Sequence, residues 1–511
     1  MKKKIVAAID IGSSSIRMII SEIIDGEVEV IDSVRHTVRL GKDSFYKGKI
    51  FRTTIDECIE ILSRYKRLCD EYGVKEIKAV ATTAVREATN SDIFLDNIFT
   101  YTGINVEIIS AYKETEYIHK VLSKRLKDTS TDNYKCIAEV GTGSVEITIF
   151  DNNFIIYSTS LPIGALKAKQ FFTKEYYQLD SSFSNYLNII VEHELRVLKR
   201  SIPCKTISKI YGVGAELEQL SIIMNKNTAH LTHIKKEELE TLCKNMQSYS
   251  KEEIIHKLNV SYDLAENFYA VSTIFLSIIN FFDSNEIFIP NITLKDCLIV
   301  EMACKMNKEK YFNQLQNQIQ INSQNIGKSF NYDENHALKV LELSLKLFDQ
   351  TKNIHRLSEY EKCYLIASAI LHDVGLAISN RDHHKHSLYI IKSQNFYYFN
   401  EKDRKIIANV ARYHRKSSPK QTHADYMALS KDERMCISKV SAILRIADSL
   451  DSHHLQLIED IEVFIKKNKL QIIATIKDNI YAEIYSFNVK KDLFEDFFGY
   501  SVQLETKKLV K

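Results

Sequence analysis

The feature that most constrains this chain is a short motif that occurs twice. Asp10–Ile16 and Glu139–Val145 share one pattern: an acid, a β-branched residue, Gly, two small residues, Ser and another β-branched residue. Both copies lie between apolar runs that have the composition of β-strands. The repeat predicts two related domains in tandem, produced by an internal duplication.

The residues around each copy predict strands that alternate with helices. Apolar strands are expected at Ile5–Ile9, Ile16–Ile24 and Val28–Ile31, and Asp25-Gly26 is a typical hairpin turn between the last two. Helical periodicity follows over Ile55–Tyr72. Further strands are expected at Ile77–Thr82 and Val106–Ser110, and further helices after Ala84 and over Lys113–Leu126. Such alternation is typical of an α/β fold.

The rest of the chain has a different pattern. Residues 165–305 read as mostly helical with one short strand near Ile210–Gly214, and a polar stretch over Asn307–Phe330 is the expected boundary. Helices are expected throughout 333–450, and a hairpin over Ile461–Ile476 opens a small α+β cap. The predicted domains are 1–127, 128–306, a helical domain over 325–455 and a cap over 456–511.

Composition excludes several classes of protein. Among 511 residues, 14 Gly and 4 Pro exclude a low-complexity chain, and nine scattered cysteines without a CxxC pair disfavour a zinc ribbon or a disulfide scaffold. The apolar run Phe268–Phe282 is shorter than the roughly 20 residues of a membrane helix, so a buried core helix is expected. A net charge of +3 gives no reason to expect a nucleic-acid partner. Without a secretory leader pattern, we expect a cytoplasmic protein that contacts no membrane.

The two repeated turns have the chemistry of a phosphate site. Glycine and small side chains let successive backbone N–H groups converge on one anion, and Ser and Thr hydroxyls add donors. The acid before each turn, Asp10 or Glu139, would hold Mg²⁺ or a water rather than touch phosphate. Two such turns that face each other would clamp phosphate in a cleft. The chain has no GxxxxGK[ST] loop, so this is not a P-loop.

The first turn resembles the first phosphate motif of the exopolyphosphatase/guanosine pentaphosphate phosphatase (Ppx/GppA) family, part of the actin-like, sugar kinase and heat-shock ATPase superfamily. Further blocks of that family are matched in the same order, at Arg39–Gly41, Ala81–Asn90, Ile108–Glu114, Glu139–Glu146 and Ser160–Gly164. The resemblance implies two tandem RNase H-like domains, a hydrolase that releases phosphate from polyphosphate or guanosine pentaphosphate, and a homodimer.

The resemblance also implies roles for residues. Glu114 matches the family's catalytic base, and its expected place at the start of a helix would let it orient an attacking water. Asp10, Glu139 and Glu146 would hold Mg²⁺. The residues expected to bind phosphate are Gly12, Ser13, Ser14, Ser15, Gly141, Thr142, Gly143 and Ser144, with Arg17, Arg39 and Arg86 as bidentate clamps.

The second motif departs from the family pattern. Glu139 replaces an Asp, Thr142 replaces a Gly and Val145 replaces a Thr, which removes a hydroxyl. Lys113 and Thr115 also differ from the family block around the base. A regulator that binds polyphosphate or a nucleotide with weak turnover therefore stays open as an alternative.

The helical third carries a second constellation, His336, His372-Asp373 and Asp448. This ordered pattern resembles the HD phosphohydrolase superfamily, and its mixed nitrogen and oxygen ligands suit Mn²⁺, Mg²⁺, Fe or Zn²⁺. The further imidazoles of His383, His384, His386 and His414 could hold a second metal or a phosphate. The domain would then be either a nucleotide phosphohydrolase in its own right or an extension of a basic channel that supports dimerisation.

Overall fold

The computed structural model describes residues 3–125, 134–151, 154–168, 181–199, 202, 206–224, 231–247, 249–260, 262–305, 308–394, 396–415 and 418–508. The chain forms two compact units, Met1–Lys308 and Glu309–Lys511. We call them unit 1 and unit 2. The finer division into four domains stays a prediction, and its boundaries at residues 127 and 306 lie outside the described residues.

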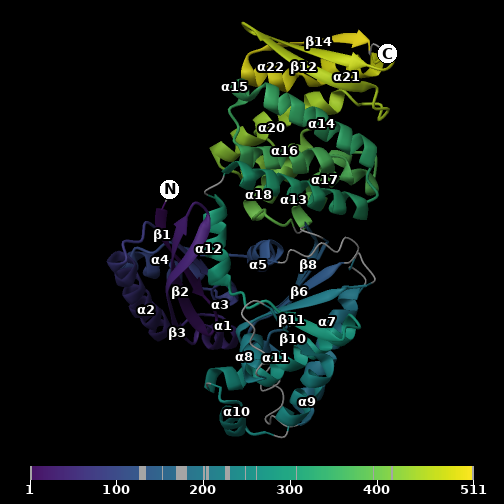
Figure 1. The fold of residues 1–511 in the computed structure, drawn as a ribbon. Coiled ribbons are helices and arrows are strands. Elements are labelled where there is room, and N and C mark those ends of the chain that lie inside the picture. Colours follow the sequence, from purple (N-terminus) through teal and green to yellow (C-terminus); the bar gives the residue numbers. More distant parts are fainter. Residues whose placement is uncertain are drawn as a thin grey trace. The chain divides into compact units, whose positions relative to one another are not determined.

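Unit 1 begins with a five-stranded sheet in the order β3-β2-β1-β4-β5. The first three strands form an antiparallel meander, and β4 and β5 continue the sheet in parallel from β1. The strands are β1 (Lys3–Ile11), β2 (Ser15–Ile24), β3 (Glu27–Thr37), β4 (Glu76–Ala81) and β5 (Val106–Ile108). The helices are α1 (Leu40–Lys47), α2 (Arg52–Glu71), α3 (Thr83–Glu87), α4 (Ser91–Thr102) and α5 (Ala111–Arg125). The predicted alternation of strands and helices is confirmed here (Figure 1).

A second sheet repeats this plan in the order β10-β11-β9-β6-β7-β8. Again three antiparallel strands come first, and β9 pairs in parallel with β6 as β4 does with β1. The strands are β6 (Lys135–Val140), β7 (Val145–Asp151), β8 (Phe154–Leu161), β9 (Lys209–Val213), β10 (Thr232–Lys235) and β11 (Glu286–Ile289). The helices are α7 (Ser181–Lys199), α8 (Ala215–Ile223), α9 (Lys236–Gln247), α10 (Lys251–Leu258), α11 (Tyr262–Phe281) and α12 (Leu294–Lys305).

The prediction of a single strand within 165–305 was wrong, because β10 and β11 lie there as well as β9. Each has four residues, which is too short for a two-residue alternation to stand out among long helices. The predicted core helix is confirmed as α11, with Phe268, Ile274 and Ile278 buried. No helix among the described residues is long and apolar enough to cross a membrane.

One hydrophobic cluster joins the two sheets of unit 1. It includes Val6 and Ala8 from β1, Ile137 from β6, Phe150 from β7 and Leu298 from α12. Helix α12 packs on both β1 and α5. Shared apolar burial of this kind holds two related sheets as one compact body.

Unit 2 is helical as far as residue 449, as predicted. Its helices are α13 (Lys308–Ser329), α14 (Glu334–Gln350), α15 (Lys352–His355), α16 (Glu359–Leu371), the 3₁₀ turn η1 (Val374–Ala377), α17 (His383–Ser393), α18 (Glu401–Arg412), α19 (Ala424–Met427) and α20 (Lys431–Ser449). The predicted hairpin is formed by β12 (Ile458–Lys466) and β13 (Lys469–Ile476), and the cap is completed by α21 (Tyr481–Lys490), α22 (Asp492–Phe498) and β14 (Ser501–Lys508).

The polar stretch expected to contain the boundary forms helix α13, and the division between the two units falls at the start of this helix. Helix α13 buries Leu315, Ile319 and Ile326, which lie on one helical face and pack into the core of unit 2. The many Asn, Gln and Lys residues at other positions of the helix make this narrow apolar stripe difficult to recognise in the sequence. The stretch is therefore part of the second unit rather than a linker before it.

Candidate functional site

The two repeated turns of unit 1 line one cavity of about 140 Å³. Strands β1 and β6 both end there, so their acids and the turns that follow reach the same space. The structure brings twelve of the predicted site residues to this cavity: Asp10, Gly12, Ser13, Ser14, Ser15, Arg17, Glu114, Glu139, Gly141, Thr142, Ser144 and Glu146.

The two turns have the same backbone hydrogen bond. The N–H of Gly12 donates to the Ser15 carbonyl at 3.0 Å, and the N–H of Gly141 donates to the Ser144 carbonyl at 2.9 Å. In the strands that flank the turns, Asp10 lies opposite Arg17 and Glu139 lies opposite Glu146. The duplication seen in the sequence is therefore a duplication of geometry, with different charges at the position opposite each acid.

A glycine-containing segment packs against each turn from outside. The Gly41 N–H donates to the Ser13 carbonyl at 2.8 Å, and the Leu166 N–H donates to the Thr142 carbonyl at 3.0 Å. A Cβ on Gly41 would lie 2.9 Å from the Ser13 Cβ, and one on Gly164 would lie 2.4 Å from backbone atoms of Gly143. Both glycines are thus required for close approach to the turn backbone.

Burial raises the pKa of all four carboxyl groups between the turns. Burial and the neighbouring Glu146 raise the pKa of Glu114 to about 8. Burial, then Glu114 and Glu146, hold the pKa of Glu139 well above its ordinary value. The pKa values of Asp10 and Glu146 are raised as well, chiefly by burial. The carboxyl groups therefore lack enough nearby positive charge to ionise together.

These residues fit a divalent cation. The Glu139 Oε2 atom is buried and has no hydrogen-bond partner within the described part of the chain. Carboxylate oxygens are the ligands that Mg²⁺ prefers, and one such ion would compensate several of the charges at once. Asp10, Glu139 and Glu146 are the residues that would hold it.

The predicted cationic clamps lie in different places. Arg17 lines the cavity and donates from Nε to the Ser15 Oγ at 3.1 Å. Arg39 is exposed just before α1 and is not among the lining residues. Arg86 is not among the lining residues, and it donates to the Ile109 carbonyl at 2.6 Å and to the Thr83 Oγ1 at 3.0 Å. Gly143 also lies outside the lining and is covered by Phe45 and Thr83.

Sequence reasoning missed several lining residues, namely Arg35, Thr82, Thr83, Glu216, Glu218 and Thr293. Glu216 and Glu218 follow β9, the parallel neighbour of β6, so their position at the same sheet edge was available from the strand pattern. Burial raises the pKa of Glu218 to about 7. The cavity is thus more acidic than the two motifs alone indicate.

Unit 2 brings together its four predicted metal ligands. His336 lies in the first turn of α14, His372 and Asp373 follow α16, and Asp448 lies in the last turn of α20. The His336 and His372 Nε2 atoms are 3.2 Å apart, and each is 3.6 Å from the Asp448 Oδ1. Asp373 Oδ2 lies 3.6 Å from the His372 Nε2.

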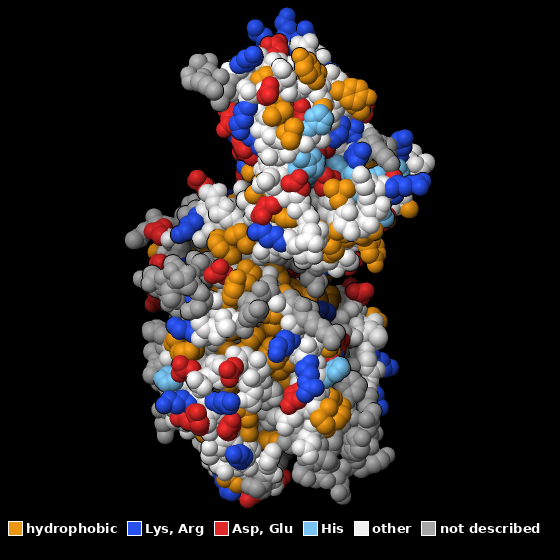
Figure 2. All heavy atoms as spheres, turned by 90° about the vertical axis from the view of Figure 1, so that its right-hand side faces the viewer, with side chains coloured by type: hydrophobic (Ala, Val, Ile, Leu, Met, Phe, Trp, Pro, Cys, Tyr) orange, Lys and Arg blue, Asp and Glu red, His pale blue; other side chains and the backbone are white. Residues whose placement is uncertain are grey.

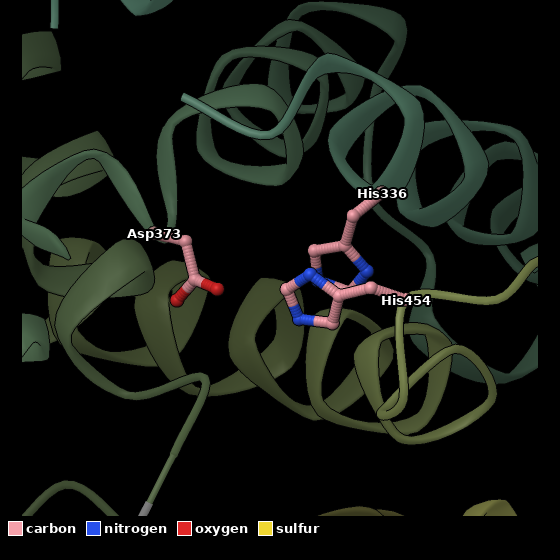
Figure 3. A group of neighbouring side chains, drawn as sticks. All are labelled: His336, Asp373 and His454. Atoms are coloured by element: carbon pink, nitrogen blue, oxygen red, sulfur yellow. The ribbon is translucent and has the colours of Figure 1, made fainter. Parts of the chain in front are cut away.

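Two further members of this cluster, His454 and Asp451, were not predicted from the sequence. His454 stacks on His336 with ring centroids 3.6 Å apart, and the Asp373 carboxylate faces the two rings (Figure 3). Asp451 Oδ2 lies 2.8 Å from the His336 Nδ1. Burial would raise the pKa of Asp448, but Lys490 and the two imidazoles hold it well below its ordinary value.

Comparisons with known proteins agree with the fold and the motifs. The model of the Ppx/GppA phosphatase family matches residues 19–306, and that of Ppx/GppA phosphatase domain III matches residues 320–484. A relative from Vibrio vulnificus, named guanosine-5'-triphosphate,3'-diphosphate pyrophosphatase, is 22% identical over 80% of this chain and 80% of its own length.

Solved structures give the same result. The Ppx/GppA family member of Aquifex aeolicus is 26% identical with a TM-score of 0.52, covering 60% of this chain and 99% of that one. An exopolyphosphatase from Cytophaga hutchinsonii has the same fold at 19% identity, with a TM-score of 0.54 over 60% of this chain and 98% of that one. Because the family model alone spans more than half of the residues, this chain belongs to the Ppx/GppA phosphatase family.

Proposed function

We propose that unit 1 hydrolyses the terminal phosphoanhydride bond of inorganic polyphosphate or guanosine pentaphosphate and releases orthophosphate. The observation that carries this proposal is the meeting of two Gly/Ser turns with a cluster of carboxyl groups in one cavity. Phosphatase family membership and the name of the Vibrio vulnificus relative support the choice of substrate.

The turns would hold the phosphate chain. Ser13, Ser14 and Thr142 line the cavity and would donate from N–H and hydroxyl groups, and Arg17 would add a guanidinium. Mg²⁺ held by Asp10, Glu139 and Glu146 would supply positive charge that offsets the phosphate oxygens and favours ionised carboxylates.

Glu114 would act as the general base. It lies in the first turn of α5 and faces the cavity. The water oxygen bonds to the terminal phosphorus, the anhydride P–O bond breaks, and the water proton passes to the Glu114 carboxylate. With a pKa of about 8, this carboxylate is a stronger base than an ordinary glutamate once it is ionised.

A phosphate-release assay with Mg²⁺ tests the proposal on polyphosphate, guanosine pentaphosphate and simple nucleotides. Glu114→Gln keeps the shape of the side chain and removes the base, so kcat should fall by about 10²–10⁴-fold. Asp373→Ala in unit 2 is the control and should leave release unchanged. Unchanged release in Glu114→Gln would contradict the assignment of the base.

A second candidate is a regulator that binds polyphosphate or a nucleotide with weak turnover. The second turn favours it, because Val145 supplies no hydroxyl and Glu139 is a longer acid than the Asp of the family motif. Tight binding by calorimetry, with release no faster than that of Glu114→Gln, would identify this function.

For unit 2 we propose an HD-type helical domain that holds a divalent metal through His336, His372, Asp373 and Asp448. If its chemistry were the main activity, acting on a nucleotide, Asp373→Ala would abolish release and Glu114→Gln would spare it. The resemblance further suggests a cytoplasmic homodimer without a nucleic-acid or membrane partner. Light scattering of the purified full-length chain should then give twice the mass of the chain.

A further inference from the structure

Three charged residues lie in a row across the first sheet of unit 1. Asp10 of β1 lies opposite Arg17 of β2, and Arg17 lies opposite Arg35 of β3. Residues that face each other in an antiparallel pair project from the same side of the sheet. All three residues line the cavity between the two turns. Arg35, which was not predicted from the sequence, therefore belongs to the same row as two predicted site residues.

The row leads from the interior of the cavity to solvent. Asp10 is buried, with 7% of its surface exposed, whereas Arg17 is half-buried and Arg35 is exposed. Neighbouring strands lie about 4.8 Å apart, so two strand spacings separate the backbones of Asp10 and Arg35 by roughly 10 Å. A chain-like ligand that reaches Asp10 along this row passes Arg35 first and Arg17 next.

Arg17 and Arg35 provide the positive charge of the cavity. Within the described part of the chain, no other lysine or arginine lines it. The acids that line it are Asp10, Glu114, Glu139, Glu146, Glu216 and Glu218. Mg²⁺ at the second hairpin would offset the charge of the terminal phosphate. A phosphate further along a chain lies away from that ion and depends on the two guanidinium groups.

Like charges that lie directly opposite each other on a sheet are destabilising and call for a group of opposite sign. The same two strands contain a second such pair, Glu22 and Glu29, at their other end. Lys3 of β1 compensates this pair, because it forms an ion pair with Glu22 at 2.8 Å. By the same argument, the arginine pair attracts anionic groups.

Carboxyl groups that follow β9 of the second sheet lie near the arginine pair. Glu216 and Glu218 are in the first turn of α8 and line the cavity. Burial raises the pKa of Glu216, and the charges of Arg17 and Arg35 oppose this effect. Burial also raises the pKa of Glu218 to about 7. A carboxyl group that takes up a proton near neutral pH compensates a cation only in part, which leaves the arginine pair able to accept phosphate oxygens.

Positive charge is more dispersed elsewhere on the surface. Figure 2 shows one face of the molecule, on which lysine and arginine side chains (blue) are scattered among acidic ones (red). On helix α2, Arg64 and Lys66 are each paired with an acid one turn away. Exposed basic residues of this kind contribute little to binding. Arg35 differs from them because a second arginine lies opposite it and both line a cavity.

We propose that Arg35 is a substrate-binding residue that, together with Arg17, holds the phosphates that follow the terminal one. The substrate is then a linear chain of at least three phosphates, with the terminal phosphate at the turns, the second near Arg17 and the third near Arg35. This proposal rests on the proposed function of unit 1 and adds the part of the substrate beyond the bond that breaks. Because Arg35 touches no reacting atom, it contributes to binding and not to the chemical step.

Calorimetry with inorganic tripolyphosphate and Mg²⁺ tests the proposal on the full-length chain. The titrations use the Glu114→Gln background, so that the ligand is not hydrolysed. Arg35→Met in this background should weaken tripolyphosphate binding about tenfold or more, because a hydrogen bond between charged groups is lost. Orthophosphate, which is too short to reach Arg35, should bind the two proteins equally well. Equal affinity for tripolyphosphate, or an equal loss for both ligands, would overturn the proposal.

Three further variants separate binding from a loss of structure. Arg35→Lys keeps the charge and should restore part of the affinity for tripolyphosphate. Glu216→Gln removes an acid near the arginine pair and should tighten tripolyphosphate binding. The matched control is Arg64→Met, which removes another exposed arginine and should leave both affinities unchanged. Weaker binding in Glu216→Gln, or the same loss in Arg64→Met as in Arg35→Met, would contradict the assignment.

Steady-state phosphate release separates this proposal from the proposed function. With the Glu114 base intact, Arg35→Met should raise KM for tripolyphosphate about tenfold or more and leave kcat nearly unchanged. A lower kcat with unchanged KM would overturn the binding role. If the wild type binds tripolyphosphate through Arg35 without releasing phosphate, the hydrolase fails and the subsite stands. Rapid release that does not depend on Arg35 would give the opposite result.

Discussion

The two hairpins of unit 1 share a backbone hydrogen-bond pattern but differ in charge balance. In the first, Asp10 lies opposite Arg17, and in the second Glu139 lies opposite Glu146. Their turns close with the same Gly-to-Ser hydrogen bond, at 3.0 and 2.9 Å. The duplicated backbone thus supports one hairpin that places an arginine opposite its acid and one that places a second acid there.

This difference assigns a separate task to each hairpin. Arg17 gives the first hairpin a positive group that can meet phosphate oxygens. The second hairpin has two acids with raised pKa values, and the Glu139 Oε2 atom lacks a hydrogen-bond partner among the described residues. We therefore expect phosphate to be held mainly by the first hairpin and Mg²⁺ mainly by the second.

Among the substitutions that distinguish the two hairpins, the largest effect should come from removing a charge at the second one. Glu139→Gln should lower Mg²⁺-dependent phosphate release by on the order of 100-fold. The loss of a metal ligand should reduce activity at least as much as the loss of a residue that only supports a ligand. Glu139→Asp restores the acid of the family motif and should keep most of the activity. The matched control is Glu218→Gln, another glutamate that lines the cavity, with a much smaller loss expected. Equal losses in Glu139→Gln and Glu218→Gln would show that the second hairpin has no special role.

A smaller effect should separate Arg17 from Arg86. Arg17→Met removes a charged donor of the cavity and should raise KM about tenfold or more with kcat less affected, because such bonds are worth about 1.5–3 kcal/mol. Arg86 does not line the cavity, but its charge lowers the pKa of Glu114 against the effect of burial. Arg86→Met should therefore move the rise of kcat to higher pH and leave KM nearly unchanged. Steady-state kinetics across pH 6–10 test both, and the reverse pattern would exchange the roles of the two arginines.

The glycines outside the turns provide a third comparison. Gly164→Ala places its Cβ 2.4 Å from the Gly143 backbone, which cannot move without shifting the second turn. Gly41→Ala places its Cβ 2.9 Å from the Ser13 side chain, a milder contact. Overpacking typically costs about 1–3 kcal/mol, so Gly164→Ala should lose more stability and more activity than Gly41→Ala. Urea denaturation and phosphate release measure both, and equal losses would contradict the difference in packing.

The sequence predicted the hairpins well and their surroundings less well. The motifs at Asp10 and Glu139 identified two turns because Gly and Ser at fixed positions determine local backbone geometry. The direction of the Arg86 side chain depends on a tertiary contact with the Ile109 carbonyl. The local sequence pattern does not encode such contacts. Helix α13 and strands β10 and β11 were missed because composition or length masked their periodicity. The pairing of His383 with His414 likewise depends on how α17 and α18 pack.

The smallest expected effect is a change in the free energy of unfolding with pH. It arises because Glu114 lies near Glu146, one of the two acids of the second hairpin. Burial and Glu146 raise the pKa of Glu114 from 4.5 to about 8, so between these values the folded chain holds a proton that the unfolded chain has released. Stability falls with pH wherever the native state binds more protons. With a chelator present, the free energy of unfolding should therefore decrease from pH 5 to pH 8, by at most about 1.4 kcal/mol per pH unit for each such proton.

Glu114→Gln should flatten this slope, whereas Glu57→Gln, an exposed position on α2, should leave it unchanged. Mg²⁺ should stabilise the protein more at pH 8 than at pH 5, because a cation competes with the protons for the same oxygens. Thermal unfolding at each pH, with Mg²⁺ or with chelator, measures both effects. Constant stability with chelator over this range would mean that the carboxyl groups ionise without a cation. The charge difference between the hairpins would then be no reason to expect Mg²⁺ at the second one.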